Sequence, residues 1–284
     1  MENAIHGFFL LMGLVTVGCV LLISVYLVVS GIPAIREIGL VKFLFGPVWN
    51  SNAAEPQFGI LPFILTSIYG TAGAILLGVP VGYMTAVFLA KMAPPKLKTA
   101  VSAAVSLLAG IPSVVYGLVG MLVLVPGIRQ VFHIPDGSGL LAAIIVLAIM
   151  ILPTVINISE TSIRAVPAGI KSSSLALGAS HVQTIFRSIL PAAKSGIVTA
   201  IVLGVGRAIG EAMAITLVSG SSVNVPLPFN SVRFLTTAIV SEMGYSSGLH
   251  RQVLFTIGLV LFVFIMIINV VLNKILKKGA DDNE

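Results

Sequence analysis

Long apolar stretches, separated by short polar joints, dominate this sequence. Six of them reach the length of about 20 residues that a helix needs to cross a hydrocarbon core of about 30 Å. They cover residues 8–31, 60–90, 100–126, 140–159, 196–219 and 253–273. Because backbone N–H and C=O groups inside a bilayer must be bonded within their own segment, each stretch is expected to be helical. The pattern predicts an all-α, polytopic membrane protein with six transmembrane helices.

The composition supports a membrane protein and excludes several other classes. Of the 284 residues, 57% are hydrophobic and 9% are charged, whereas soluble domains have about 45–50% apolar and about 25% charged residues. The single cysteine excludes a disulfide-stapled secreted domain. The mean hydropathy of +1.10 excludes a disordered tail. The net charge of +6 comes without a basic stripe outside the apolar stretches, so no nucleic-acid partner is predicted.

Lys and Arg residues are distributed unequally between the two sets of loops that six alternating spans create. One set holds ten of them: Lys91, Lys96, Lys98, Arg164, Lys171, Arg187, Lys194, Lys274, Lys277 and Lys278. The opposite set holds five: Arg36, Lys42, Arg129, Arg233 and Arg251. Because basic loops stay in the cytoplasm, both termini are predicted to be cytoplasmic. The alternative is that the charges fall this way by chance.

Proline and glycine residues interrupt the predicted spans. Four prolines each remove a backbone donor: Pro62, Pro80, Pro112 and Pro153. Glycines such as Gly78 allow helices to approach closely. Freed carbonyls in a membrane are tolerated only where they are buried in protein or line a cavity. The spans are therefore predicted to pack into a pathway-forming bundle rather than to serve as passive anchors.

The longest cytoplasmic joint, residues 160–195, carries an amphipathic pattern. Apolar residues recur at helical spacing in two short segments, which are separated at Gly178 and end at Pro191. Each segment is too short to cross a membrane and only marginally stable alone. We expect a cytoplasmic helical hairpin between spans 4 and 5 that docks into a groove on another protein. The alternative is a hairpin that lies on the lipid surface.

The hairpin resembles the coupling loop of type I ABC importer permeases, which follows the pattern E-A-A-x3-G-x9-I-x-L-P. Three serines stand where Glu-Ala-Ala would be, Gly178 matches, Ser188 replaces the Ile, and the Leu-Pro pair matches. In such permeases this loop docks the cytoplasmic ATPase subunit. The resemblance therefore implies an ATPase coupling loop made of Ser172, Ser173, Ser174, Leu175, Ala176, Leu177, Gly178, Ala179, Leu190 and Pro191.

Three further motifs resemble the PstC family of permease subunits in bacterial phosphate importers. They read AGIPSVVYGLVG at 109–120, ISETSIRAVP at 158–167 and GRAIGEAMAITLVSG at 206–220. The resemblance extends from about residue 58 to residue 278. It divides the chain into an anchor helix with the first external loop (1–58), a permease core (59–278) and a short cytoplasmic tail (279–284).

This resemblance implies a transport subunit rather than an enzyme. Such a subunit moves inorganic phosphate across the cytoplasmic membrane of a bacterium or archaeon by alternating access. The implied partners are phosphate, a homologous PstA-like permease subunit, two PstB-like ATPase subunits and an extracytoplasmic PstS-like phosphate-binding protein. No cofactor is expected on this chain, because ATP is used by the partner subunit.

Arg207 and Glu211 are charged residues inside the fifth predicted span. Arg207 lies eleven residues beyond Gly196, which places it roughly 16 Å deep and close to the bilayer midplane. Glu211 is expected on the same helical face, within reach of an ion pair. A buried charge is costly in a membrane and so usually marks a site. Guanidinium offers bidentate donors to a tetrahedral oxyanion.

Two functions of this pair stay open. In the first, Arg207 attracts phosphate along the substrate pathway, while Glu211 orients Arg207 and keeps the anion from being held too tightly. In the second, the two residues form a buried ion pair that only fixes helix packing. The resemblance favours the first, because the matching Arg and Glu are associated with phosphate passage in PstC-type subunits.

Other function classes have less support. The sequence has no phosphate-cradling G-x-x-x-x-G-K-[ST] motif, so this chain is not an ATPase. It also lacks H-E-x-x-H and a nucleophile elbow, which argues against an intramembrane enzyme. A permease for sulfate or molybdate and an ion-coupled secondary transporter remain alternatives. The docking hairpin argues against the secondary transporter.

The remaining candidate residues have weaker patterns. Trp49, with Phe43, Phe45 and Phe58, predicts an aromatic belt at the membrane interface. The four histidines lie in separate segments without ligand spacing, so no metal site is predicted: His6, His133, His181 and His250.

Overall fold

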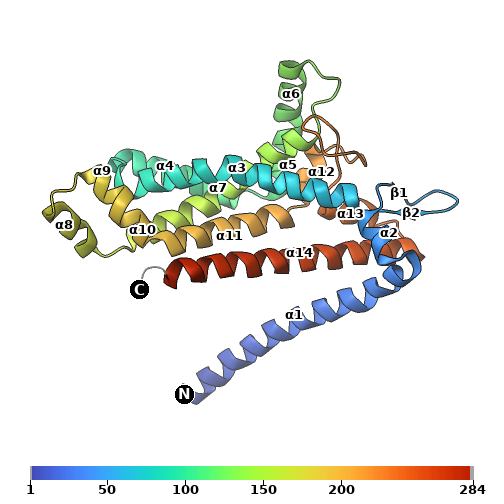
Figure 1. Ribbon diagram of the computed structural model, residues 1–284, viewed down its shortest axis with the longest axis horizontal. Helices are drawn as coiled ribbons and strands as arrows, with labels where there is room; N and C mark the ends of the chain where they lie inside the picture. The colour runs from blue at the N-terminus through green and yellow to red at the C-terminus, as the bar shows by residue number, and fades with distance from the viewer. Residues whose placement is uncertain (1, 282–284) are drawn as a thin grey trace. The chain divides into compact units, whose positions relative to one another are not determined.

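The computed structural model describes the backbone of residues 2–281 and the side chains of residues 5–271 and 274. Five helices are long and apolar enough to cross a membrane. A further pair of helical segments, His181–Ala192 and Lys194–Gly210, is bent by 68° and gives a sixth span when the pair is counted as one. The prediction of an all-α, multi-pass membrane protein is confirmed (Figure 1). The described residues form two compact units. The first contains residues 1–61 and 238–263, and the second contains residues 62–237 and 264–284.

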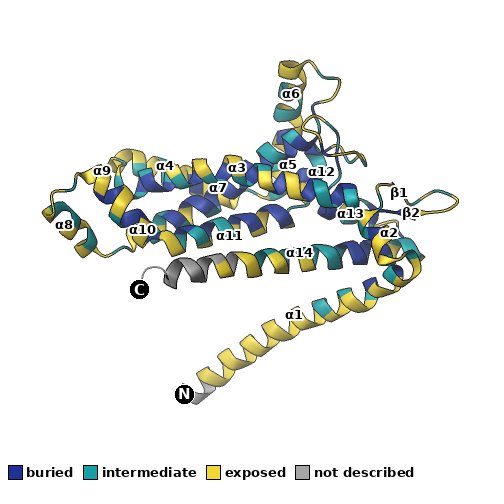
Figure 2. Ribbon diagram, viewed as in Figure 1, coloured by how far each residue is buried: buried dark blue, intermediate teal, exposed yellow. Residues whose placement is uncertain are grey.

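The first unit contains α1 (Glu2–Ile38), α2 (Leu40–Phe45) and a two-stranded hairpin of β1 (Trp49–Asn50) and β2 (Gln57–Phe58). The two strands are antiparallel, and Trp49 pairs with Phe58. Thr256 donates a hydrogen bond of 2.8 Å to the Gly31 carbonyl, in the C-terminal part of α1. Most of α1 before that contact is exposed in Figure 2 and apolar, as expected for a helix that faces lipid.

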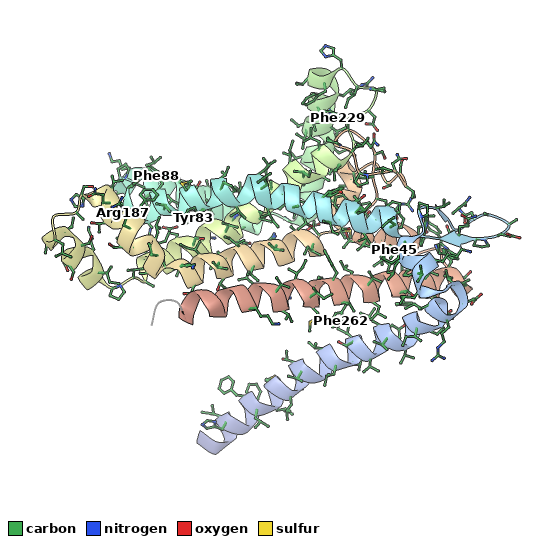
Figure 3. All side chains as sticks on the ribbon, viewed as in Figure 1. Phe45, Tyr83, Phe88, Arg187, Phe229 and Phe262 are labelled. Carbon is green, nitrogen blue, oxygen red and sulfur yellow. The ribbon has the colours of Figure 1, made fainter. Side chains whose placement is uncertain are left out.

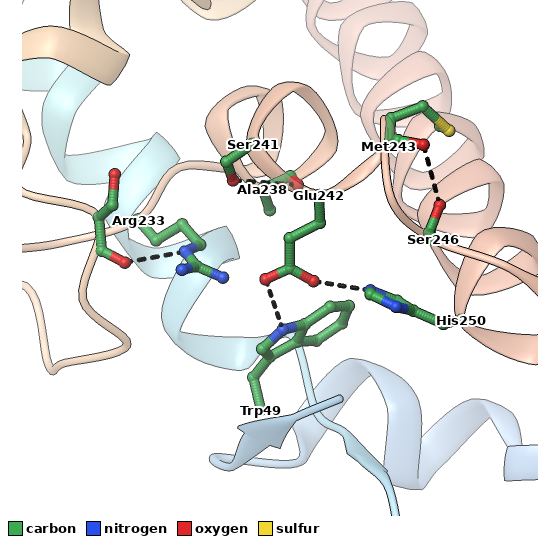
Figure 4. Close-up of polar contacts among 9 residues, drawn as sticks. Trp49, Arg233, Ala238, Ser241, Glu242, Met243, Ser246 and His250 are labelled. Carbon is green, nitrogen blue, oxygen red and sulfur yellow. Dashed lines mark hydrogen bonds and ion pairs between the residues drawn. The ribbon is translucent and has the colours of Figure 1, made fainter. Parts of the chain in front are cut away.

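A buried polar cluster holds the hairpin of the first unit (Figure 4). Glu242 accepts hydrogen bonds from Trp49 Nε1 at 3.2 Å and lies 2.7 Å from His250 Nε2. The Phe58 ring stacks on the His250 ring, with centroids 5.9 Å apart. Phe43, Trp49 and Phe58 are all less than 10% exposed. The predicted aromatic belt is therefore wrong for these three rings, because they pack against protein and a buried carboxylate.

The second unit is built around α7 (Leu140–Arg164), which runs beside α3 (Leu61–Lys91) and α11 (Lys194–Gly210) (Figure 1). Gly78 on α3 allows a close approach to the α7 backbone, since a Cβ there would lie 2.9 Å from the Ala148 carbonyl oxygen. Beside it, Val155 and Ile151 of α7 are fully buried. These contacts agree with the prediction that the spans pack together as a bundle.

The third predicted span, residues 100–126, is wrong as a single helix. It is divided into α4 (Pro95–Gly110), α5 (Ser113–Val119), the π-helix η1 (Gly120–Leu124) and α6 (Val125–Phe132). Pro112 cannot donate a backbone hydrogen bond and forces Ile111 into an extended conformation with ψ of 128°. The apolar segment that can span a membrane is therefore Ser113–Phe132.

The fifth predicted span, residues 196–219, is also interrupted. Helix α11 ends at Gly210, and a separate helix, α12 (Met213–Val218), follows. A loop leads from there to α13 (Leu235–Glu242) and α14 (Gly248–Asp281). The predicted tail, residues 279–284, begins inside α14, and its residues 282–284 lie outside the described part of the chain.

The joint at residues 160–195 contains short helices, as the amphipathic pattern predicts. They are α8 (Ala168–Ala176), α9 (His181–Thr184), the π-helix η2 (Ile185–Ile189) and α10 (Leu190–Ala192). Gly178 separates α8 from α9 with φ of 85°, a left-handed conformation that favours glycine. We call residues 168–192 the docking hairpin.

Candidate functional site

Arg207 lies in the last turn of α11 and is exposed on the surface of the chain. Among the described residues, its guanidinium has no hydrogen-bond or ion-pair partner. Its position next to the unpaired carbonyls at the end of α11 is electrostatically favourable. Tyr116 on α5 lies within electrostatic range of this guanidinium, and its hydroxyl donates to the Leu108 carbonyl at 2.6 Å. The charge of Arg207 is thus available to a group outside this chain.

Glu211 does not share a helical face with Arg207. Because α11 ends at Gly210, Glu211 has an extended backbone with ψ of 133°. Its carboxylate accepts a hydrogen bond of 3.0 Å from the Ala214 N–H, and its carbonyl accepts one of 2.8 Å from Thr236. The expected ion pair between Arg207 and Glu211 is absent from the described residues. Both hypotheses, that Glu211 orients Arg207 and that the two residues only fix helix packing, depend on that ion pair.

The break between α11 and α12 exposes backbone groups within an apolar segment. The last carbonyls of α11 and the first N–H groups of α12 have no partner inside their helices. Glu211 satisfies one of these N–H groups, that of Ala214. Backbone breaks at membrane depth persist only where protein covers them or where they line a cavity. Among the described residues, the break therefore places a guanidinium without an acidic partner beside irregular backbone.

An apolar cavity of about 600 Å³ lies between α5, η1, α6 and α7. Its lining includes Val115, Tyr116, Val119, Ile128 and Ile149 and contains no charged side chain. An oxyanion would lose its hydration there without gaining a counter-charge. The cavity suits an apolar occupant and is not the anion site.

The docking hairpin has an exposed tip and a buried root. Leu177, at the tip, is 88% exposed, and Ser172, Ser173, Ala176 and Gly178 are also exposed. The half-buried residues of the predicted loop are Ser174, Leu175 and Ala179.

The root of the hairpin joins the core of the second unit. Leu190 is buried in a cluster that includes Val87, Ile163 and Ile189, whereas Pro191 is exposed. The structure thus separates the predicted coupling residues into a surface near the tip and an anchor at the root. Leu190 belongs to the anchor.

A hollow of about 750 Å³ opens on the docking hairpin. It is lined by residues from both of its arms, among them Ile170, Ser173, Leu177 and Arg187. Arg187 is an exposed side chain on η2 (Figure 3). Thr184 and Ser188, which are not among the predicted coupling residues, bond to Ser174. Thr184 has no signal in the sequence beyond its hydroxyl group, whereas Ser188 stands at the Ile position of the coupling pattern.

The chain is similar in sequence to known membrane components of transport systems. The family described as "Binding-protein-dependent transport system inner membrane component" matches residues 78–280, which include the docking hairpin and the break after α11. The chain is 38% identical over 264 residues to the probable ABC transporter permease protein YqgH of Bacillus subtilis, covering 90% of this chain and 85% of that protein. It is 34% identical over 263 residues to the phosphate transport system permease protein PstC of Haemophilus influenzae, covering 85% and 82%.

Solved structures share the fold. The methionine ABC transporter MetNI, in an inward-facing conformation, aligns with a TM-score of 0.62 and 21% identity, over 78% of this chain and 97% of that chain. An amino acid ABC transporter solved with histidines aligns with a TM-score of 0.56 and 22% identity, over 77% and 92%. At these identities the likeness describes the arrangement of helices alone.

Proposed function

Because the chain belongs to the family of binding-protein-dependent transport system inner membrane components, we propose that it is a permease subunit of an ATP-driven importer for inorganic phosphate. The observation that carries this proposal is the 34% identity to a phosphate transport system permease protein over 85% of the chain. Proteins of this family are transport subunits rather than enzymes, so ATP hydrolysis belongs to a separate chain. The direction of transport is into a bacterial or archaeal cell.

In this proposal Arg207 attracts phosphate along the substrate pathway. The residue lies 13 positions after Lys194, about 20 Å along α11, and an unpaired charge at such depth is costly unless it faces water or a partner. A guanidinium can donate two parallel hydrogen bonds to a phosphate. Since Arg207 is exposed on this chain, the pathway lies on a surface shared with a homologous, PstA-like second permease subunit.

Glu211 has a revised role in the same pathway. Its carboxylate holds the start of α12 and therefore maintains the break next to Arg207. Its negative charge, one residue beyond the end of α11, also limits how tightly the site holds an anion. A pathway must release what it admits.

The docking hairpin supplies the connection to the energy source. Leu177 at its tip exposes 88% of its surface, and burial of a leucine side chain stabilises an interface by about 1.5–3 kcal/mol. We assign this tip to one of two PstB-like ATPase subunits, each of which binds one permease subunit. With both termini in the cytoplasm, the external loops face a PstS-like phosphate-binding protein.

Reconstitution of the complete transporter tests the proposal. The chain, its second permease subunit, the ATPase and the binding protein are placed in liposomes, and uptake of phosphate, sulfate and molybdate is measured with and without ATP. We expect ATP-dependent uptake of phosphate alone. Uptake of another oxyanion in its place would contradict the substrate, and uptake driven by an ion gradient without ATP would contradict the class of transporter.

A further inference from the structure

Helix α8 has few means of keeping its position on the docking hairpin. None of its nine residues is buried, and its only half-buried apolar residues are Ile170 and Leu175, so apolar packing within the chain contributes little to fixing its angle. Helix η2, by contrast, is anchored through Ile185 and Ile189, which are 8% and 1% exposed. Any device that holds α8 must therefore join it to the α9–η2 arm.

A cluster of three hydroxyl groups makes that connection. The Ser174 Oγ on α8 lies 3.0 Å from the Thr184 Oγ1 on α9, and the Ser188 Oγ on η2 donates to the Ser174 Oγ at 3.2 Å. Thr184 is 1% exposed, and the two serines are half-buried. Partial exclusion of water strengthens such bonds. The three groups satisfy one another across the two arms.

The local structure of the second arm brings Thr184 and Ser188 to the same side. Ser180 and Gln183 form a reciprocal capping box, with bonds of 3.2 and 2.9 Å, that fixes where α9 begins. Thr184 and Ser188 are four residues apart, and the wide π-helical turn of η2 keeps such residues on one face. Both hydroxyl groups therefore reach the single side chain of Ser174.

The three consecutive serines of α8 differ in what they do. Ser172 bonds to the carbonyls of Ala168 and Gly169 within its own helix. Ser173 is exposed. Ser174 alone of the three bonds to the other arm, and its partner Ser188 stands where the coupling pattern has Ile. Two of the four departures from the coupling pattern, Ser174 and Ser188, thus contact each other.

We propose that Ser174, Thr184 and Ser188 form a hydroxyl clip that holds α8 at a fixed angle to α9 and η2. The clip transmits the movement of the ATPase through η2 and α10 to α11, which carries Arg207. These residues are positioning residues: they act on transport through the hairpin and contact no substrate. The inference rests on the proposed function, since an undocked hairpin has no movement to transmit.

The reconstituted transporter tests the clip through the number of phosphate ions moved per ATP hydrolysed. Loss of one neutral hydrogen bond changes an equilibrium by about fivefold, so Ser174→Ala and Ser188→Ala should each lower this ratio by about fivefold. The ATPase subunit should still co-purify at the wild-type level. Thr184→Ser, which keeps the hydroxyl, should keep the ratio. Thr99→Ala is the matched control, because the Thr99 hydroxyl is exposed and bonds only to its own helix.

A disulfide in place of the clip gives a second, independent measurement. In a Cys19→Ser background, which removes the single native cysteine, Ser174→Cys and Ser188→Cys are combined. The hydroxyl oxygens they replace are 3.2 Å apart. Two cysteine sulfurs at these positions would need to move closer by only about 1 Å to reach the disulfide length of about 2.05 Å. We expect the oxidised transporter to have the wild-type ratio and the reduced transporter to have a lowered one.

Several results would overturn the clip. These are an unchanged ratio in both alanine variants, a cysteine pair that does not oxidise, and loss of the ATPase from the alanine variants, which would make the serines docking contacts. Failure of the proposed function looks different: the wild-type chain itself would not bind an ATPase or would not carry phosphate.

Discussion

The Glu211 carboxylate accepts a hydrogen bond from the Ala214 N–H at 3.0 Å, across the break that ends α11. This bond directs the carboxylate toward α12 and leaves Arg207 without an acidic partner among the described residues. The positive charge that the chain carries into the membrane is therefore free to meet a ligand or a second subunit. A neutralised pair would offer no such attraction.

Replacement of Glu211 should test whether its carboxylate holds the start of α12. Glu211→Gln keeps an oxygen acceptor for Ala214, whereas Glu211→Ala leaves that N–H unsatisfied and should destabilise the protein by about 1 kcal/mol, as the loss of a helix cap does. Thermal unfolding in detergent measures the difference. Equal melting temperatures for the two variants would show that the Ala214 bond does not stabilise the break.

Replacement of Arg207 should reduce transport without disrupting assembly. Hydrogen bonds to a charged group contribute about 1.5–3 kcal/mol, so Arg207→Leu should lower phosphate uptake by about 10- to 100-fold. Arg207→Lys should retain part of it, because a lysine keeps the charge but not the bidentate geometry. Uptake assays on purified, fully assembled transporter provide the measurement. Normal uptake by Arg207→Leu would exclude a role in the pathway, and loss of the second subunit would assign Arg207 to packing.

The sequence predicts the spans well and their interruptions poorly. The six apolar stretches were recognisable because a membrane helix has a fixed length and composition. The break at Pro112 had a visible cause, yet a proline alone does not reveal whether a helix bends or ends. The break after Gly210 has no proline at all, and Arg207 and Glu211 have the spacing of a helical ion pair. Tertiary contacts, such as the Thr236 bond to the Glu211 carbonyl, determine the outcome there.

The docking hairpin was predictable because its signals are local. Amphipathic periodicity, Gly178 and Pro191 lie within a few residues of the structure that they determine. The buried cluster of the first unit was not predictable, since Trp49 and Glu242 are 193 residues apart. A pattern read along the chain carries no information about such a pair.

The tip of the docking hairpin should control affinity for the ATPase. Leu177→Ala removes most of an exposed apolar side chain that a partner would bury, and the loss of about 1.5–3 kcal/mol corresponds to about 10- to 100-fold weaker binding. Titration of the ATPase onto the permease pair in detergent measures this affinity. Leu97→Ala is the control, because Leu97 is also exposed, at 44%, but lies on α4. Equal affinity in the two variants would contradict docking at Leu177.

The buried cluster around Glu242 should maintain the β1–β2 hairpin, and its integrity is measurable through Trp49. This residue is the only tryptophan of the chain, so intrinsic fluorescence reports on its surroundings alone. Glu242→Ala removes the acceptor for Trp49 Nε1 and the neighbour of His250. Because a buried donor that loses its partner costs about 1–3 kcal/mol, the hairpin should loosen, admit water and shift the emission to longer wavelength. Glu55→Ala, in the exposed turn between the strands, should leave the emission unchanged. An unshifted spectrum for Glu242→Ala would mean that ring packing with Phe58 holds the hairpin without the carboxylate.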